Sequence, residues 1–264
     1  MKNIIFTDLD GTFLNHHDYS FEESKQALQK IKQNNIPLIF TTSKTRIEVE
    51  ELQKKVQIDE PYIIENGAAL FIPKNYQDLD TSFLTDYEDK KVLIIGMTYK
   101  QILNFYNEYK DEFGMVGFSD MSDEKVEELT GLSKESVKLA KQRDFTEPFI
   151  LKDISKLEKL KNLASTYKIK ITQGGRFFHL IGEKQDKGIA VERSVKLFEK
   201  LYQDYIRSIA LGDGPNDISM LKKVNLPIII QNHEGKYLDI ELPKLKKSSF
   251  QGSKGWNEMV LQYV

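Results

Sequence analysis

A short apolar run that ends in two carboxylates is the feature that most constrains the fold of this chain. Residues 3–14 read NIIFTDLDGTFL, so four apolar or β-branched residues lead straight into Asp8, Asp10 and Gly11. Short runs that are apolar throughout are typical of strands in a parallel sheet covered on both faces. Ligands bind beyond the carboxyl ends of such strands. The run therefore predicts a buried strand that delivers two carboxylates to a ligand-binding edge.

Strands and amphipathic helices alternate at both ends of the chain, which predicts an α/β fold with a Rossmann-like parallel-sheet core. The N-terminal part predicts strands at residues 4–7 and 36–41, helices at 21–34 and 45–56, and a strand–turn–strand unit at 61–72. After Asp186 the pattern predicts a helix at 187–202, a strand at 206–212, a helix at 215–224 opened by Pro215, and a strand at 226–231.

The middle of the chain has a different pattern, with strands near residues 92–96, 114–118, 168–172 and 176–182 separated by helices. The helices are expected at residues 99–112, 123–130, 134–142 and 154–167. This arrangement predicts an inserted α+β cap domain at residues 85–185. The catalytic core would then be discontinuous, formed by residues 1–84 and 186–264.

Composition excludes several classes of function. The chain has 264 residues, no cysteine and a net charge of -2, from 38 basic and 40 acidic side chains. This balance gives no general attraction to nucleic acid or anionic membranes. No apolar run approaches the roughly 18 residues of a membrane span. No signal-peptide layout begins the sequence, and the absence of cysteine fits a reducing compartment. We therefore expect a cytoplasmic protein with no nucleic-acid or membrane partner.

Three strands far apart in the sequence are expected to bring polar groups to one edge of the sheet. Asp8 follows the first strand, Thr42 and Ser43 follow the second, and Asp213 follows the strand at residues 206–212. Converging carboxylates repel one another and raise each other's pKa. A bound Mg²⁺ would remove this conflict, because it accepts carboxylates, waters and a phosphate oxygen as ligands.

The same edge is expected to receive groups suited to a phosphate. Lys187 opens the helix that resumes the core and would supply positive charge, while Thr42 would add a hydroxyl donor. The segment GDGPND at residues 212–217 is a glycine-rich turn into a helix N-terminus, which suits anions and orients carboxylates.

Several of these residues have a simpler interpretation when each is taken alone. Two aspartates two positions apart are often a surface Asx-turn, and Lys187 alone would be a solvated helix lysine. The other candidates with a structural explanation are Arg143 and Arg176 as salt-bridged surface arginines, His16 and His17 as solvated loop residues, and His179 as a strand residue.

Four segments together resemble the signature motifs of the haloacid dehalogenase superfamily, in order: DLDGTFL, TTSKTR, DKG and GDGPND. The insertion between the second and third resembles the large α/β cap of the type IIB members. The segments IIENGAALFIP, TGLS, RDFTEPF, TQGGRFFHLIG and DKGIAV are further similar to the mannosyl-3-phosphoglycerate phosphatases. The resemblance covers nearly the whole chain.

The resemblance implies a role for each residue of the motifs. Asp8 would be the nucleophile that forms an aspartyl-phosphate, and Asp10 would protonate the leaving oxygen and later deprotonate water. Thr42 and Lys187 would bind the phosphoryl group, with Thr42 favoured and Ser43 an alternative. The residues implied at the Mg²⁺ site are Asp8, Asp10 (also through its backbone carbonyl), Asp213 and Asp217, with Asn216 nearby.

The resemblance also implies that the cap recognises the rest of the substrate. Arg143 and Arg176 would bind its anionic groups, because arginine offers a planar fork of donors. Glu147 would bind sugar hydroxyls, and Gly175 would let backbone amides approach closely. Lys44 and Arg46 would reach the substrate from the core side, and Ser43 is a further substrate-binding candidate.

The implied function is a Mg²⁺-dependent phosphatase that hydrolyses mannosyl-3-phosphoglycerate or glucosyl-3-phosphoglycerate to the glycosylglycerate, a compatible solute. The sugar stays open, and either a monomer or a homodimer is expected. One alternative is a phosphatase of another sugar phosphate. The other is a sugar-phosphate-binding regulator with little turnover, against which the intact leaving-group acid Asp10 argues.

Overall fold

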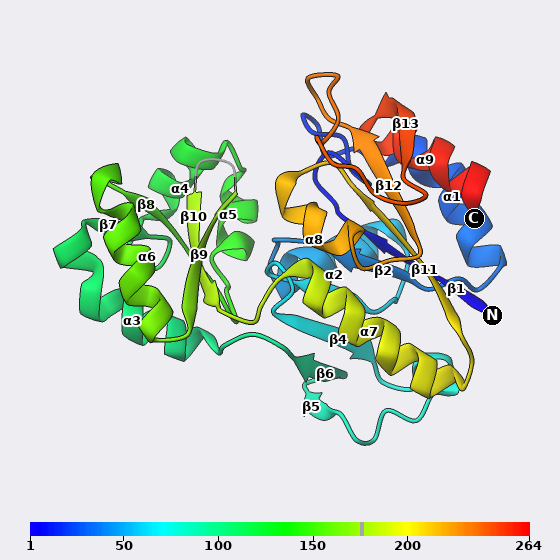
Figure 1. Ribbon diagram of the computed structural model, residues 1–264, viewed down its shortest axis with the longest axis horizontal. Helices are drawn as coiled ribbons and strands as arrows, with labels where there is room; N and C mark the ends of the chain where they lie inside the picture. Colours follow the sequence, from blue (N-terminus) through cyan, green and yellow to red (C-terminus); the bar gives the residue numbers. More distant parts are fainter. Residues whose placement is uncertain (175–176) are drawn as a thin grey trace. The chain divides into compact units, whose positions relative to one another are not determined.

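The computed structural model describes residues 1–174 and 177–264, and the chain divides into two compact units (Figure 1). The first comprises residues 1–42, 59–93 and 186–264, and the second comprises residues 43–58 and 94–185. The boundaries of the two units separate parts of the chain that pack mainly within themselves. The predicted division into a catalytic core (1–84 and 186–264) and a specificity cap (85–185) concerns function and stays a prediction.

A large, mostly parallel sheet forms the first unit. Among the described residues it has nine strands in the order β13-β12-β11-β1-β2-β3-β4-β6-β5, and neighbours from β13 to β3 run parallel. Its strands are β1 (Lys2–Thr7), β2 (Leu38–Thr41), β3 (Tyr62–Ile64), β4 (Ala69–Pro73), β5 (Thr85–Tyr87), β6 (Lys90–Ile94), β11 (Ile206–Gly212), β12 (Leu226–Gln231) and β13 (Lys246–Gln251). The predicted parallel-sheet core is confirmed.

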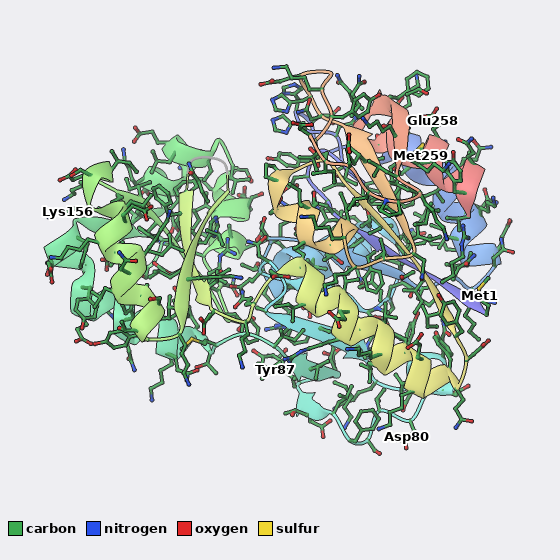
Figure 2. The ribbon with its side chains drawn as sticks, in the orientation of Figure 1. Met1, Asp80, Tyr87, Lys156, Glu258 and Met259 are labelled. Atoms are coloured by element: carbon green, nitrogen blue, oxygen red, sulfur yellow. The ribbon has the colours of Figure 1, made fainter. Side chains whose placement is uncertain are left out.

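The sheet is covered on both faces at its centre, because every residue of β2, β3 and β4 is buried. Helix α1 (Lys25–Gln33) packs with α9 (Gly252–Tyr263), and α7 (Lys187–Tyr202) packs with α8 (Ile218–Leu221). Figure 2 shows Glu258 and Met259 on α9. Met259 is buried, whereas the Glu258 carboxylate accepts a hydrogen bond from the Ser249 backbone N–H at 2.7 Å.

Two helix starts position residues of the expected site. Helix α7 begins at Lys187, as predicted, because the Asp186 side chain caps it by accepting a hydrogen bond from the Ile189 N–H at 2.7 Å. The helix predicted at residues 215–224 is shorter than expected. A 3₁₀ turn at Pro215–Asp217 leads into the single turn α8, which places Asp217 at the joint between the two.

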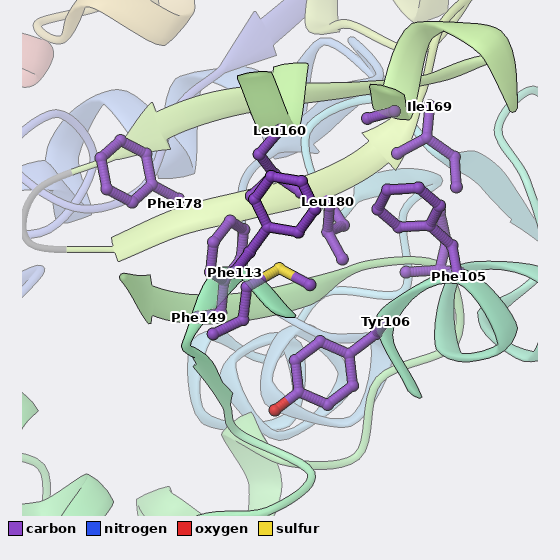
Figure 3. Packing of buried hydrophobic residues seen from close by; sticks show 11 residues of the cluster. Phe105, Tyr106, Phe113, Phe149, Leu160, Ile169, Phe178 and Leu180 are labelled. Atoms are coloured by element: carbon purple, nitrogen blue, oxygen red, sulfur yellow. The ribbon is translucent and has the colours of Figure 1, made fainter. Parts of the chain in front are cut away.

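The second unit contains an antiparallel sheet of four described strands in the order β7-β8-β10-β9. Its elements are α2 (Arg46–Val56), α3 (Tyr99–Phe113), β7 (Met115–Gly117), α4 (Asp123–Thr130), α5 (Lys134–Ala140), β8 (Glu147–Leu151), α6 (Leu157–Thr166), β9 (Ile169–Gly174) and β10 (Phe177–Gly182). Aromatic and aliphatic side chains from α3, α6 and the sheet form its core, shown in Figure 3. The predicted α+β character is confirmed.

Four strands depart from the sequence expectations, and one of them is β5, where no strand was predicted. The strand expected near residues 92–96 is β6, which joins the large sheet instead of the antiparallel one. β8 was not predicted, because Pro148 within EPFIL argues against a strand interior. β13 was not predicted either, because KKSSFQ is largely polar, as is common at a sheet edge.

None of the helices within residues 1–174 and 177–264 has the length and apolar character needed to cross a lipid bilayer.

Candidate active site

The carboxyl ends of β1 and β11 bring Asp8 and Asp213 to one edge of the large sheet. The two strands are parallel neighbours, with Thr7 opposite Leu211. One residue further on, the Asp8 N–H donates to the Leu211 carbonyl at 2.9 Å. Because this register is fixed by the ladder of both strands, the two carboxylates that follow them lie close together, as the sequence predicts.

Lys187 connects Asp8 to a second buried carboxylate. Its Nζ donates to Asp8 Oδ1 at 2.6 Å and to Asp217 Oδ1 at 2.7 Å, and its side chain has no exposed surface. The other oxygen of Asp217 accepts hydrogen bonds from the N–H groups of Asp213 and Gly214 at 3.1 and 3.0 Å. Asp217 is therefore held on both oxygens, which suits it to position Lys187 and the turn that carries Asp213.

Burial and like charge perturb the pKa values of these groups. Burial, then Asp217, raises the pKa of Asp8 well above its ordinary value, although Lys187 opposes the shift. Burial, then Asp217, raises the pKa of Asp213 to about 7. Burial lowers the pKa of Lys187, but Asp217 and Asp8 outweigh this and raise it above its ordinary value. Lys187 is thus a permanent cation in a site that holds more carboxylates than it can neutralise.

This excess of negative charge fits a divalent cation. Oxygens of Asp8, Asp213 and Asp217 lie within 4.8 Å of one another, and hard cations such as Mg²⁺ prefer oxygen ligands. Gly11, at φ +84°, forms one wall, because a Cβ there would lie 2.6 Å from Asp213 Oδ2. The site therefore combines carboxylates suited to a metal with the Gly11 backbone, which lies too close to Asp213 to carry a side chain.

Asp10 lies in the turn that follows the nucleophile candidate. The Asp10 carboxylate does not belong to the cluster formed by the carboxylates of Asp8, Asp213 and Asp217. The predicted contact of Asp10 with a metal would therefore come from its backbone carbonyl. The turn is closed by the Leu14 N–H, which donates to the Leu9 carbonyl at 2.8 Å, and by the Gly11 N–H, which donates to the Leu14 carbonyl at 3.0 Å. The aspartate is thus carried on a well-defined loop.

Thr12 and Trp256 also support the site, although neither was assigned a role in it from the sequence. The Thr12 hydroxyl donates to Asp213 Oδ1 at 2.7 Å. The Trp256 indole N–H donates to the Thr7 hydroxyl at 3.0 Å, which in turn donates to the Asp8 carbonyl at 2.8 Å. Thr12 belongs to the DLDGT motif, so the sequence offered a signal that could have placed it at the site. Trp256 contacts a segment too distant in the sequence for spacing to predict the contact.

Thr42 is buried directly after β2. Its N–H donates to the Ile63 carbonyl at 3.0 Å, and its carbonyl accepts from the Asn66 N–H at 2.8 Å. The neighbouring Thr41 hydroxyl donates to the Ile39 carbonyl, so that group is engaged by its own strand. The amide of Asn216 donates to the Asn66 side chain at 3.3 Å, which connects the β3–β4 turn to the turn before α8.

In the second unit, two of the predicted substrate residues, Arg143 and Ser43, contact each other. Arg143 donates through Nε to the Ala140 carbonyl and through Nη1 to the Ser43 carbonyl, both at 2.9 Å. Lys44 Nζ lies 3.8 Å from a Glu48 carboxylate oxygen. Arg143 is half-buried. Its hydrogen bond to the Ser43 carbonyl connects it to the segment that carries Ser43 and Lys44.

Glu147 and His179 are the buried titratable groups of this sheet. Glu147 accepts hydrogen bonds from the Tyr99 hydroxyl at 2.6 Å and from the Ser119 N–H and hydroxyl at 2.8 and 2.7 Å. Burial raises its pKa. Burial, then Arg143, lowers the pKa of His179 to about 3, so this imidazole is neutral at ordinary pH. The other two predicted substrate residues, Gly175 and Arg176, lie outside the described residues.

Comparison with known proteins gives the family. The profile of the haloacid dehalogenase-like hydrolases matches residues 5–239, and the chain belongs to that family. It is 46% identical over 258 residues to the glucosyl-3-phosphoglycerate/mannosyl-3-phosphoglycerate phosphatase of Persephonella marina, covering 97% of this chain and 95% of that one. The corresponding phosphatase of Methanococcoides burtonii is 37% identical, covering 100% and 98%. The structure of a haloacid dehalogenase-like hydrolase from Bacteroides thetaiotaomicron superposes with a TM-score of 0.71 at 15% identity over 100% of both chains, which shows the shared fold.

Proposed function

We propose that this chain is a phosphoric monoester hydrolase that converts glucosyl-3-phosphoglycerate or mannosyl-3-phosphoglycerate to the glycosylglycerate and phosphate. The observation that carries the proposal is the buried Asp8, held by Lys187 at 2.6 Å beside two further carboxylates. The substrate class is supported by the relative that is 46% identical across 97% of this chain and is named for those two substrates.

The proposed mechanism begins with Asp8 as the nucleophile. One Asp8 oxygen forms a bond to phosphorus while the bond from phosphorus to the glycerate oxygen breaks. Asp10 donates its proton to that leaving oxygen, so the glycosylglycerate departs neutral at the former ester oxygen. Asp10 then takes a proton from water, which attacks the phosphorus of the aspartyl-phosphate, releases inorganic phosphate and restores Asp8.

The remaining residues of the site hold charge and orientation. Lys187 lowers the pKa of Asp8, against the burial that raises it, and bears positive charge close to the phosphoryl oxygens. Thr42 is proposed to donate its hydroxyl to the phosphoryl group, with Ser43 as the alternative. A Mg²⁺ ion would be held by Asp8, Asp213 and the Asp10 carbonyl. Asp217 would orient the turn that carries Asp213. When bound, Mg²⁺ supplies charge that neutralises the phosphoryl oxygens.

A phosphate-release assay on a panel of substrates tests this function. The panel contains both glycosyl-3-phosphoglycerates, mannose 6-phosphate, 3-phosphoglycerate and p-nitrophenyl phosphate. We expect kcat/KM to be highest for one or both glycosyl-3-phosphoglycerates. A higher value for mannose 6-phosphate would support another sugar phosphatase. Tight binding with no release in saturating Mg²⁺ would support the regulator. Chelation with EDTA should abolish turnover, and Mg²⁺ should restore it.

Arg143 tests the proposed recognition of the glycerate carboxylate. Loss of one charge-assisted hydrogen bond costs roughly 1.5–3 kcal/mol, so Arg143→Ala should lower kcat/KM about 10- to 150-fold on the glycosyl-3-phosphoglycerate. The effect on p-nitrophenyl phosphate, which has no carboxylate, should be small. An equal loss on both substrates would instead assign Arg143 to holding the segment that contains Ser43. Location in the cytoplasm and assembly as a monomer or homodimer stay predictions.

A further inference from the structure

A hollow of about 450 Å³ lies in the first unit beside the loop that follows β1. Its walls come from this loop, from the turn after β12, from the end of β13 and from the start of α9. The first two of these segments are separated by most of the sequence. Three of the four histidines of the chain line it: His16, His17 and His233. Nothing in the proposed phosphatase mechanism uses them.

The three imidazoles are in contact. The rings of His16 and His233 are stacked, with centroids 3.8 Å apart and planes at 5°. The His17 ring stands edge-on to both, with centroids at 5.1 Å from His16 and 6.0 Å from His233. Such contacts disfavour simultaneous protonation, because adjacent imidazolium ions would repel one another.

The neighbouring imidazoles favour the neutral form of His16, whereas nearby carboxylates favour its protonated form. Partial desolvation, then His233 and His17, lowers the pKa of His16, although Asp10 opposes the shift. Neutral imidazole is the form that binds metal ions. Two carboxylates, Asp18 and Glu23, line the same hollow. The ammonium group of the lining residue Lys254 lies 4.1 Å from the centre of the Phe250 ring.

We propose that His16, His17 and His233 form a binding site for a borderline divalent transition-metal ion, such as Ni²⁺ or Zn²⁺, separate from the carboxylate site. Imidazole nitrogen suits these ions, whereas an all-oxygen set suits Mg²⁺. The binding does not depend on the proposed function.

Metal binding requires the cluster to rearrange. Among the described residues, only Asp8, Asp213 and Asp217 bring oxygens within 4.8 Å of one another as a set that could hold a metal, and the stacked rings of His16 and His233 hold their nitrogen lone pairs in nearly parallel planes. One of the two stacked imidazoles must therefore turn to share an ion with the other. All three histidines are exposed and lie in loops or turns, so their side chains have the freedom to do so.

Calorimetric titration of the untagged protein with Ni²⁺, in excess Mg²⁺ to occupy the carboxylate site, tests the proposal. We expect one Ni²⁺ to bind wild type with Kd well below ~1 mM. The double variant His16→Gln/His233→Gln should bind at least about tenfold more weakly, a change of ~1.4 kcal/mol. His179→Gln removes the fourth histidine, and Gln251→Ala removes a lining side chain that is not an imidazole; both should bind as wild type does. Asp213→Asn should also retain Ni²⁺ binding.

Spectroscopy gives a second readout. Cu²⁺ bound to wild type should show nitrogen hyperfine coupling in its electron paramagnetic resonance spectrum, and the double variant should lose it. The proposal is overturned if the double variant binds Ni²⁺ as tightly as wild type, or if Asp213→Asn, but not the double variant, loses binding. It is also overturned if wild type binds no more tightly than ~1 mM.

Discussion

At the scale of single residues, Lys187 shows how one buried cation affects both the stability of the fold and the charge of the site. It contacts Asp8 and Asp217 at 2.6 and 2.7 Å with no exposed side-chain surface. Desolvation alone would make such an ammonium costly, and its two carboxylate partners offset that cost. Removing the cation would leave two buried carboxylates facing each other, so stability and charge at the site depend on the same group.

Lys187→Met should destabilise the protein by about 3–5 kcal/mol, because it leaves uncompensated buried charge. Lys196→Met is the matched control on the same helix, where the lysine is 70% exposed and pairs with Glu192. Exposed pairs contribute less than ~1 kcal/mol. Urea denaturation in the absence of Mg²⁺ measures both. Equal midpoints for the two variants would contradict this account of Lys187.

Asp8→Asn should retain the fold and lose turnover by at least ~1,000-fold, since an amide cannot attack phosphorus and no second nucleophile is proposed. Asp89→Asn, at a side chain that is 79% exposed, is the control and should keep full activity. Phosphate release under saturating substrate gives the comparison, and circular dichroism confirms folding. Turnover of Asp8→Asn within about tenfold of wild type would exclude the covalent mechanism.

At the scale of elements, the start of α7 is positioned by close backbone approach. Gly67, in the β3–β4 turn at φ +90°, lies so near that a Cβ there would be 2.2 Å from the Asp186 carbonyl. This contact sets where Asp186 caps the helix and therefore where Lys187 enters the site. The Asn66–Gly67 turn thus serves the site through the helix it abuts as well as joining two strands.

Gly67→Ala should lower kcat at least about tenfold, because the added carbon must displace the start of α7 and with it Lys187. Gly131→Ala is matched in backbone conformation, at φ +74°, but its Cβ would meet nothing within 4 Å. It should cost only ~1–2 kcal/mol of stability, with turnover unchanged. Steady-state kinetics and thermal melts of both variants separate the two effects. The account of the turn is wrong if the two variants lose kcat equally.

At the scale of the whole molecule, several buried groups make stability depend on pH in opposite directions. Glu60 accepts a hydrogen bond from the Tyr76 hydroxyl at 2.5 Å, and burial raises the pKa of Glu60 to about 7. The folded chain therefore keeps this proton to a higher pH than the unfolded chain. Between about pH 4.5 and 7 this group reduces stability as pH rises, whereas the neutral His179 increases stability as pH rises from about 3 to 6.5.

Glu60→Gln should isolate the contribution of that carboxyl group. The difference in melting temperature, variant minus wild type, should grow by several degrees from about pH 5 to about pH 8, because one pKa unit corresponds to ~1.4 kcal/mol. Contributions from His179 and from the aspartates of the site are common to both proteins and cancel. Differential scanning calorimetry at each pH gives the values. A difference that stays constant with pH would show that Glu60 titrates normally.

The sequence by itself determined the parts of this protein that depend on local pattern. The apolar runs before Asp8 and Asp213 and the Asp186–Lys187 helix start predicted where those strands end and where α7 begins. Parallel strands then bring their carboxyl ends to one edge, so the proximity of Asp8 and Asp213 followed from pattern and topology together. The motifs resembling those of the haloacid dehalogenase superfamily were sufficient to indicate the family.

Only the tertiary structure decided which distant groups meet. The hydrogen bonds from Thr12 to Asp213 and from Trp256 through Thr7 to Asp8 depend on strand order and helix packing, which spacing along the chain does not encode. The same holds for β13, whose polar residues form a strand because β12 offers an edge, and for His233, which stacks on His16 from the far end of the sequence. Periodicity reports whether a residue is buried, whereas its partner is fixed by the register and packing of the whole fold.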